Sequence, residues 1–284
     1  MNNYIQTRKM IHDEVEQLPI IDSVQWHYKF SAFSASLRWL MPYIPQEQHE
    51  ALFRQTLLNQ RLANLDEYYF NELSIQLQAD NAVDLAGLTS RPSIVCTYHL
   101  GSYRLLPHWL MARGVSICTL LATDVLEAQG EGMLALAANT CLRNGATCTL
   151  IDAQRPKAGL QMRTALRQGK TIVAYLDGNT GTLPNNRSTN AITIPFLHGE
   201  MRVRTGLATL ANIARVPLYS MVSEPVVGRE ATIRCLQVIA PPKGKERPIF
   251  AYTATDELYG DLQSVVKRHP WWWDGWLSVH EQLY

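Results

Sequence analysis

Apolar and polar residues follow two different patterns along this chain, and the change comes near residue 90. Before it, residues 47–60 and 66–78 favour helices, because their apolar side chains recur at helical spacing. No strand signal of comparable strength accompanies them. Beyond it, short apolar runs alternate with helical stretches, which is typical of β-α-β units. We therefore expect a helical N-terminal region over residues 1–90 and an α/β region over residues 91–284, joined in one compact unit.

Within the second region the pattern predicts individual elements. Pro156 suits a first helical turn and Gly169 suits the end of that helix. Because strands alternate with helices, we expect an α/β fold with a mostly parallel central sheet flanked by helices. Strands are predicted at residues 93–98, 115–122, 146–151, 171–176, 192–196, 218–222 and 232–239, and helices at 131–142, 156–168, 206–214 and 252–268.

Composition narrows the class of protein. The chain has 284 residues, of which 46% are hydrophobic, enough for one large domain or for a core with a helical appendage. A formal net charge of +1, with Lys and Arg spread along the chain, argues against a nucleic-acid partner. The five cysteines show no C-x-x-C spacing, and four of them lie in apolar runs. They indicate buried thiols in a reducing compartment and no metal site.

The ends and apolar runs of the chain bear on location. The first sixteen residues are polar and charged, which argues against a signal peptide. No uncharged apolar run approaches the ~18 residues of a membrane span. We expect a cytoplasmic protein, at most peripheral on the inner membrane. Residues 30–45 are rich in aromatics with one charge. This segment either packs as a helix on the core, which we favour, or lies on a membrane or lines an acyl tunnel.

The candidate chemistry begins where the first predicted strand of the α/β region ends. Residues 93–98 are followed by His99, then by Gly101, and then by a helical pattern. Open α/β sheets bind ligands at the carboxyl ends of their strands. A histidine in this position is suited to act as a general base. The alternative is a histidine that only hydrogen-bonds a loop.

Further segments at predicted strand ends narrow the functional interpretation of His99. They are residues 146–152, 169–180, 194–199 and 204–219, and they are followed by an aromatic block at 270–277. Taken in order with residues 99–104, they resemble the lysophospholipid acyltransferase superfamily, most closely the bacterial branch that acylates lipid A and phosphatidylinositol mannosides. That branch has a strand ending in His-x-Gly-x-Trp-Glu, then an acidic residue before a Gly/Thr-rich loop, then Val-Pro-Phe-x-Gly. The resemblance covers roughly residues 90–284.

The resemblance implies acyl transfer from a thioester of acyl-carrier protein or coenzyme A to a hydroxyl or amine, with His99 as the base. It implies no cofactor apart from that donor. The acceptor would attack the thioester directly, because the chain has no Gly-x-Ser-x-Gly nucleophile elbow. Backbone N–H groups near Gly101 or at the following helix start would stabilise the oxyanion.

The chain departs from the family at the residue that should orient the histidine. The family has an acid there, whereas this sequence has Arg104, whose charge would lower the pKa of His99. Asp177, which ends another predicted strand before Gly178, is our candidate for the missing acid. The alternatives are an unassisted His99 and an Asp177 that serves only the turn. Tyr103 replaces the motif tryptophan, and Ser278 stands where the branch usually has histidine.

Five residues are candidates for substrate binding. Arg104 would bind a carboxylate or phosphate, and Tyr103 lies beside it in the same motif. Arg202 and Arg204 would hold a phosphopantetheine or an acceptor anion, or else form a solvated face. Asp152, on the second motif, would contact the acceptor or simply end a strand. The aromatic block at 271–276 either covers an acyl pocket or packs in the core.

Two other functions fit the same residues. Without the motif acid, the chain could be an inactive scaffold that binds acyl chains or acyl-carrier protein. It could also be a thioesterase, in which His99 activates water. An acid within reach of His99 favours an enzyme over a scaffold.

Overall fold

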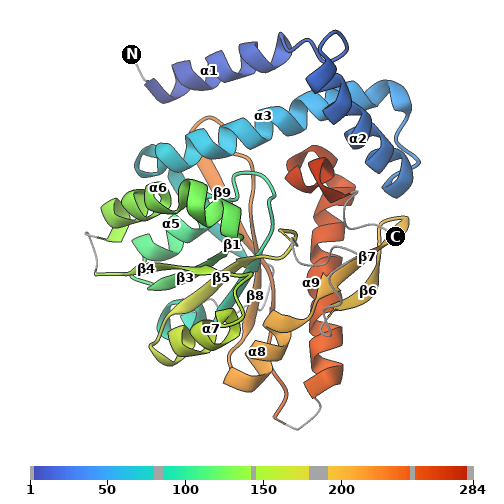
Figure 1. Ribbon diagram of the computed structural model, residues 1–284. Helices are drawn as coiled ribbons and strands as arrows, with labels where there is room; N and C mark the ends of the chain where they lie inside the picture. Colours follow the sequence, from blue (N-terminus) through green and yellow to red (C-terminus); the bar gives the residue numbers. More distant parts are fainter. Residues whose placement is uncertain (1–2, 80–85, 142–144, 179–190, 244–246, 280–284) are drawn as a thin grey trace.

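A seven-stranded sheet forms the centre of the computed structural model, which describes residues 3–79, 86–141, 145–178, 191–243 and 247–279 (Figure 1). Its strands are β1 (Ser74–Ala79), β2 (Ile94–Thr97), β3 (Ile117–Leu121), β4 (Cys148–Asp152), β5 (Thr171–Tyr175), β8 (Leu218–Ser223) and β9 (Glu230–Ile239), in the order β1-β9-β8-β2-β5-β3-β4. From β8 to β4 all neighbours are parallel, whereas β9 runs antiparallel to β8 and parallel to β1. The expected α/β class with a mostly parallel sheet is confirmed.

Helices cover both faces of this sheet. They are α1 (Asn3–Glu16), α2 (Val24–Leu40), α3 (His49–Tyr68), α4 (Ala86–Ser90), α5 (Leu105–Ala112), α6 (Thr123–Cys141), α7 (Ala158–Arg167), α8 (Gly206–Ala214) and α9 (Arg247–Arg268). Successive strand residues point to opposite faces. Val95 on β2 therefore joins a core with Trp109 of α5, and its neighbour Ile94 joins a second core with Ala165 of α7 and Leu258 of α9. Strands buried on both faces explain the continuous apolar runs in the sequence.

One prediction about the N-terminal region is wrong. Residues 66–78 do not form a helix throughout, because α3 ends at Tyr68 and residues 74–79 are strand β1. Ile75 and Leu77 alternate with polar residues and pack on the core, which is the two-residue period of a half-buried strand. Since β1 is a strand of the central sheet, a boundary near residue 90 would separate it from the other six strands.

A second difference lies before α8. The sequence predicts one strand there and then an arginine-bearing lead into the helix. The structure has a hairpin, β6 (Ala191–Phe196) and β7 (Gly199–Arg204), which forms a separate antiparallel two-stranded sheet. Gly199 is needed at the turn, because a Cβ on it would lie 2.7 Å from Nε1 of Trp39 on α2.

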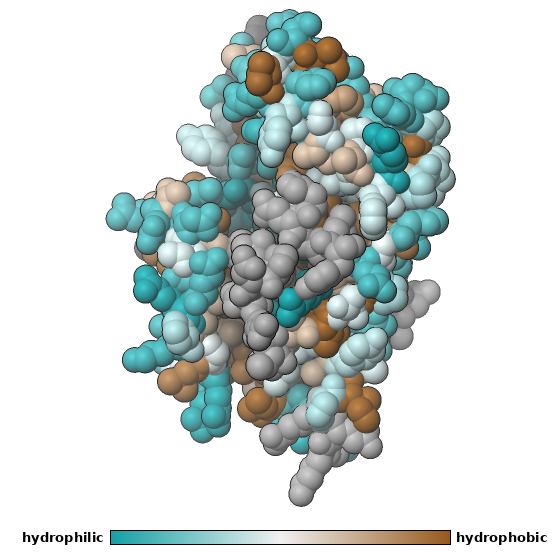
Figure 2. All heavy atoms as spheres, turned by 45° about the vertical axis from the view of Figure 1, so that its right-hand side comes forward, coloured by the Kyte–Doolittle hydropathy of each residue, from teal (hydrophilic) through white to brown (hydrophobic). Residues whose placement is uncertain are grey.

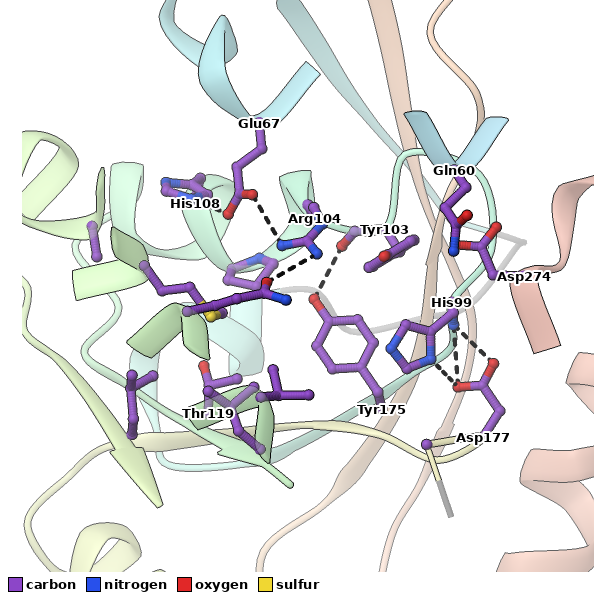
Figure 3. A pocket seen from close by; sticks show the side chains of 18 of the residues that line it. Gln60, Glu67, His99, Tyr103, Arg104, His108, Thr119, Tyr175, Asp177 and Asp274 are labelled. Carbon is purple, nitrogen blue, oxygen red and sulfur yellow. Dashed lines mark hydrogen bonds and ion pairs between the residues drawn. The ribbon is translucent and has the colours of Figure 1, made fainter. Parts of the chain in front are cut away.

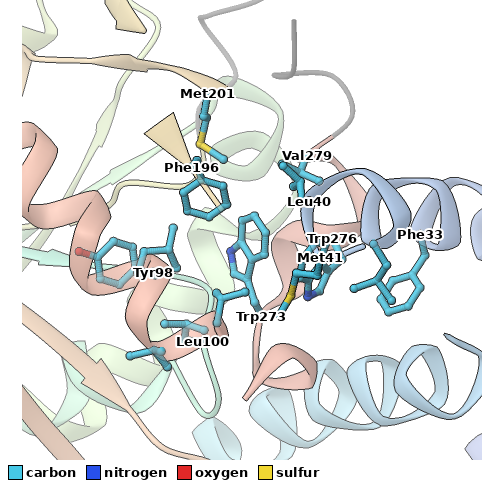
Figure 4. Close-up of a cluster of buried hydrophobic side chains, with 14 of the residues drawn as sticks. Phe33, Leu40, Met41, Tyr98, Leu100, Phe196, Met201, Trp273, Trp276 and Val279 are labelled. Carbon is cyan, nitrogen blue, oxygen red and sulfur yellow. The ribbon is translucent and has the colours of Figure 1, made fainter. Parts of the chain in front are cut away.

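A third apolar core joins α2, α3, this hairpin and the C-terminal aromatic block (Figure 4). Phe33 and Leu40 of α2 are buried against Trp276, Trp273 and Phe196. The preferred interpretation of residues 30–45, a helix packed on the core, is confirmed for its helical part. Trp273 and Trp276 pack in the core as well.

Exposed apolar residues remain on the surface. On the face in Figure 2, hydrophobic residues are scattered among hydrophilic ones. No helix in the part of the chain that the structure describes is long and apolar enough to span a membrane.

Candidate active site

His99 and Asp177 meet at the carboxyl edge of the sheet. Strands β2 and β5 are parallel neighbours with Thr97 opposite Tyr175, so the residues that follow both strands reach the same edge. Asp177 Oδ1 lies 2.9 Å from His99 Nδ1. Its two oxygens also accept the backbone N–H of His99, at 3.1 and 2.9 Å (Figure 3). The expected contact between Asp177 and the imidazole is therefore present.

Trp273 completes this arrangement. Its indole N–H donates to Asp177 Oδ2 at 2.8 Å, and the Asp177 side chain is almost wholly buried. Sequence reasoning did not find this contact, because the aromatic block indicates burial but not which carboxylate the indole reaches. With Nδ1 held by Asp177, the Nε2 atom of His99 points away from that carboxylate (Figure 3). Nε2 is the nitrogen that a base of this geometry uses.

The pair also sets the protonation of both groups. Burial lowers the pKa of His99, but attraction and hydrogen bonding from Asp177 outweigh it, so the pKa is raised overall. Burial raises the pKa of Asp177, but the contacts with His99 and Trp273 outweigh it, so that pKa is lowered overall. The predicted opposing effect of Arg104 on His99 is present and is the smaller one. A more basic imidazole is thus held by an ionised carboxylate.

Two tyrosines fix the His99 ring. Tyr175 stacks on it, with centroids 4.8 Å apart and planes at 27°, and Tyr103 approaches edge-on at 4.8 Å and 72°. The Tyr175 hydroxyl donates to the Tyr103 carbonyl at 3.2 Å. The His99 side chain remains 31% exposed. Tyr103 therefore contacts the candidate base and lines its cavity, and its predicted role in substrate binding stays a prediction.

His99 opens on a cavity of about 410 Å³ between the sheet edge, α3, α5 and α6. Its polar end holds His99, Asp177, Asp274 and Gln60 (Figure 3). Its other walls are mainly apolar. They include Pro107, Met111, Leu121, Val125, Met133, Ala137, Cys148 and Leu150. Such a cavity suits a substrate with a reactive polar group and an apolar chain.

Arg104 lines the same cavity with its charge already paired. Its Nη1 lies 3.2 Å from Glu67 Oε2, and Glu67 Oε1 lies 3.2 Å from Nε2 of His108. The Glu67 side chain is only 10% exposed, so this ion pair lies inside the protein rather than on its surface. Sequence reasoning missed Glu67, which lies on α3 inside the region predicted to be only helical.

The other predicted binding residues are not brought to His99. Asp152 ends β4, where it accepts from the Thr123 hydroxyl and the Gln154 backbone and pairs with Arg155. It lines a different pocket. Arg204 lines a third cavity, of about 190 Å³, which shares Tyr175 and Gly178 with the wall of the first. Arg202, on the same strand as Arg204, is half-buried.

Gly101 is required by the backbone conformation of the turn after β2, and its own N–H is not an oxyanion donor. Its φ is +58°, and a Cβ would lie 2.3 Å from the Ser223 carbonyl oxygen. Its N–H donates to the Trp272 carbonyl at 2.9 Å and so is not available to an oxyanion. This excludes the N–H of Gly101 itself, while the expectation for the N–H groups near it and at the helix start stays a prediction. In the Gly178-Asn179-Thr180 segment, the residues after Gly178 lie outside the described part of the chain.

Within the described residues, no group of His, Cys, Asp and Glu could hold a metal ion. No protein-family model matches the sequence, and no curated protein matches it either. Among solved structures, the chain is similar to the 1-acyl-sn-glycerophosphate acyltransferase of Thermotoga maritima. The identity is 10%, the TM-score is 0.35, and the match covers 84% of this chain and 95% of that one. So distant a similarity to an acyltransferase carries no functional argument, and the function is inferred from the site.

Proposed function

We propose that this protein is an acyltransferase that moves an acyl group from an acyl-carrier-protein or coenzyme A thioester to a hydroxyl or amine, with His99 as general base. One observation carries this proposal: His99 is held by Asp177 at the carboxyl edge of the sheet and opens on a cavity that is otherwise mainly apolar. The ordered motifs that resemble lysophospholipid acyltransferases, and their lipid A branch in particular, support it from the sequence.

The reaction follows from these positions. His99 Nε2 takes the proton of the acceptor, and Asp177 stabilises the imidazolium that forms. The acceptor oxygen or nitrogen attacks the thioester carbonyl, and a backbone N–H of the turn between β2 and α5 stabilises the tetrahedral oxyanion. The C–S bond breaks, and His99 returns the proton to the thiolate. The acyl chain occupies the apolar part of the cavity.

Asp177 favours an enzyme over a scaffold. The family acid is lost at Arg104, yet a carboxylate from the next strand reaches the same imidazole. A scaffold would have no use for this pairing. None of the five cysteines, all of them described, is in a disulfide, which fits the reducing cytoplasm. We propose that location, at most peripheral on the inner membrane.

The test is a product assay. The protein would be incubated with coenzyme A and carrier-protein thioesters of several chain lengths, together with mixed alcohols and amines, and products would be identified by mass spectrometry. We expect acylated products and a loss of ~100-fold or more in turnover for His99→Ala, as is usual when a general base is removed. His27→Ala, on the exposed face of α2, is the matched control. Equal turnover in folded His99→Ala would refute the base, and free fatty acid alone would indicate a thioesterase.

A further inference from the structure

Asp274 is a second carboxylate beside His99 that the mechanism above leaves without a task. It begins the short 3₁₀ turn Asp274–Leu277, and its backbone N–H donates to the His99 carbonyl at 2.9 Å. The residue is 8% exposed and lines the same cavity as His99 and Gln60 (Figure 3). Its position is therefore fixed by the backbone of the candidate base itself.

Neither carboxylate oxygen of Asp274 has a hydrogen-bond partner in the part of the chain that the structure describes. Asn59 is close enough to lower its pKa, but the Asn59 amide donates to the carbonyls of Gly101 and Trp272, at 3.4 and 3.1 Å. Burial is the largest influence and raises the pKa of Asp274 to about 7. A buried carboxylate without a partner is unfavourable, and folded proteins usually pair such groups.

The charged groups that line the cavity have other partners. Arg104 and His108 contact Glu67, and His99 contacts Asp177. Asp274 is thus a carboxylate of this wall that forms no ion pair with a described side chain, although the charges of His99 and Arg104 act on it from nearby. A positively charged hydrogen-bond donor that enters the cavity next to His99 would supply both the missing charge and the missing hydrogen bonds.

We propose that Asp274 binds the ammonium group of a primary amine, so that the acyl acceptor is an amine and the product an amide. This inference rests on the proposed function and narrows it, because the mechanism alone admits a hydroxyl equally well. An ammonium ion supplies both the charge and the N–H donors that the two oxygens of Asp274 lack.

Two bases, Asp274 and His99, account for the protons that the ammonium group loses. The bound ammonium, R–NH₃⁺, gives one proton to Asp274 and becomes a neutral amine. As its nitrogen attacks the thioester carbonyl, His99 takes the second proton, and the third remains on the amide nitrogen. The C–S bond breaks, His99 passes its proton to the thiolate, and Asp274 releases its proton to solvent. The products are an amide, a thiol and one proton.

The experiment compares acceptors that differ in one group. Alkylamines and alkanols of equal chain length would be tested with acyl-coenzyme A donors on the full chain, Asp274→Asn and the exposed control Asp13→Asn. We expect the unsubstituted chain to prefer the amine. Asp274→Asn should raise the Michaelis constant for the amine by ~10-fold or more, as for loss of a charged hydrogen bond. It should lower transfer to the alkanol by a much smaller factor, because only the charge of Asp274 near His99 is lost there. If Asp274→Asn folds poorly, Asp274→Ser serves as a second variant.

Binding gives a readout that needs no turnover. Alkylammonium chloride should raise the melting temperature of the unsubstituted chain, relative to sodium chloride at equal concentration, and should not do so for Asp274→Asn. Equal loss of transfer to amine and alkanol would overturn the inference, and so would transfer to alkanols alone, which leaves the proposed function standing. If no thioester reacts with any acceptor, the proposed function fails, and the absence of ammonium-specific stabilisation would overturn the inference separately.

Discussion

Asp177 contacts the His99 imidazole from the end of the neighbouring strand and not from the segment that carries the histidine. Neighbouring parallel strands lie about 4.8 Å apart, so a carboxylate that follows β5 reaches a histidine that follows β2. This contact was predictable, because both residues end predicted strands. Trp273 and Glu67 were not, because they come from segments whose sequence shows burial or helicity without naming the partner.

The Asp177 contact predicts a pH profile. Because Asp177 raises the pKa of His99 above its ordinary 6.5, kcat/KM should rise with pH through a midpoint above that value as His99 loses its proton. In Asp177→Asn the lowering effect of burial on the His99 pKa is opposed only by the charge of Asp274, so turnover should fall and the midpoint should move to lower pH. Kinetics between about pH 5 and pH 9 check this. An unchanged midpoint would mean that Asp177 does not act through the imidazole.

Asp274 predicts a pH-dependent stability. Its pKa is raised from 3.8 to about 7 in the folded chain, so the folded state holds the proton more tightly than the unfolded state does. Stability contributed by this proton is full below pH 4 and is lost as pH rises through about 7. The free energy of unfolding of Asp274→Asn, relative to that of the unsubstituted chain, should therefore increase with rising pH, by at most about 4 kcal/mol. Urea unfolding at pH 5 and pH 8 measures the difference, and a constant difference would contradict it.

At the scale of secondary-structure elements, the hydrophobic pattern of the sequence predicted the strands buried on both faces most accurately. Central strands such as β2 and β5 are continuous apolar runs, which are hard to misread. Strands β1 and β7 were missed because each is only half apolar. In β7, Met201 and Val203 are buried while Glu200 and Arg204 are exposed. Short alternation next to long helices is easily taken for a helix end or a loop.

The turn between β2 and α5 predicts a strong glycine requirement. Gly101→Ala should destabilise the fold by ~3 kcal/mol or more, because the new Cβ would meet the Ser223 carbonyl at 2.3 Å in a left-handed conformation. Gly114→Ala is the matched control, since Gly114 has φ +81° and open space, with nothing within 4 Å, where its Cβ would stand. It should cost about 1 kcal/mol. Equal losses in thermal unfolding would show that the close approach to Ser223 is not decisive.

At the scale of the whole molecule, the site is enclosed by segments from both ends of the chain. Helices α2 and α3 and the C-terminal aromatic block form one core, and α3 supplies Gln60 and Glu67 to the cavity wall. The sequence predicts these helices but not that they lie beside the cavity. Helical spacing shows which face of a helix is apolar but not which segment covers that face. Helix α3 is therefore part of the candidate site.

The cavity predicts a limit on acyl chains. Ala137 lies on α6, buried in the apolar wall, so Ala137→Phe should fill space that a long chain needs and shift preference to shorter donors. Ala138→Phe, exposed on the next position of the same helix, is the control. Relative kcat/KM across a series of acyl-coenzyme A donors measures the shift. If chain preference is the same in both variants, the acyl chain lies elsewhere.

Strand β1 has a consequence for how the protein is made. Its Ser74 pairs with Glu230 of β9, so this edge of the sheet closes a loop of about 155 residues, an entropic cost met before any contact is gained. On the ribosome, β1 cannot pair until β9 has emerged. Trp273, which holds Asp177, emerges later still. A nascent chain would thus carry both His99 and Asp177 without the indole that holds Asp177, and synthesis itself would delay activity until Trp273 has emerged.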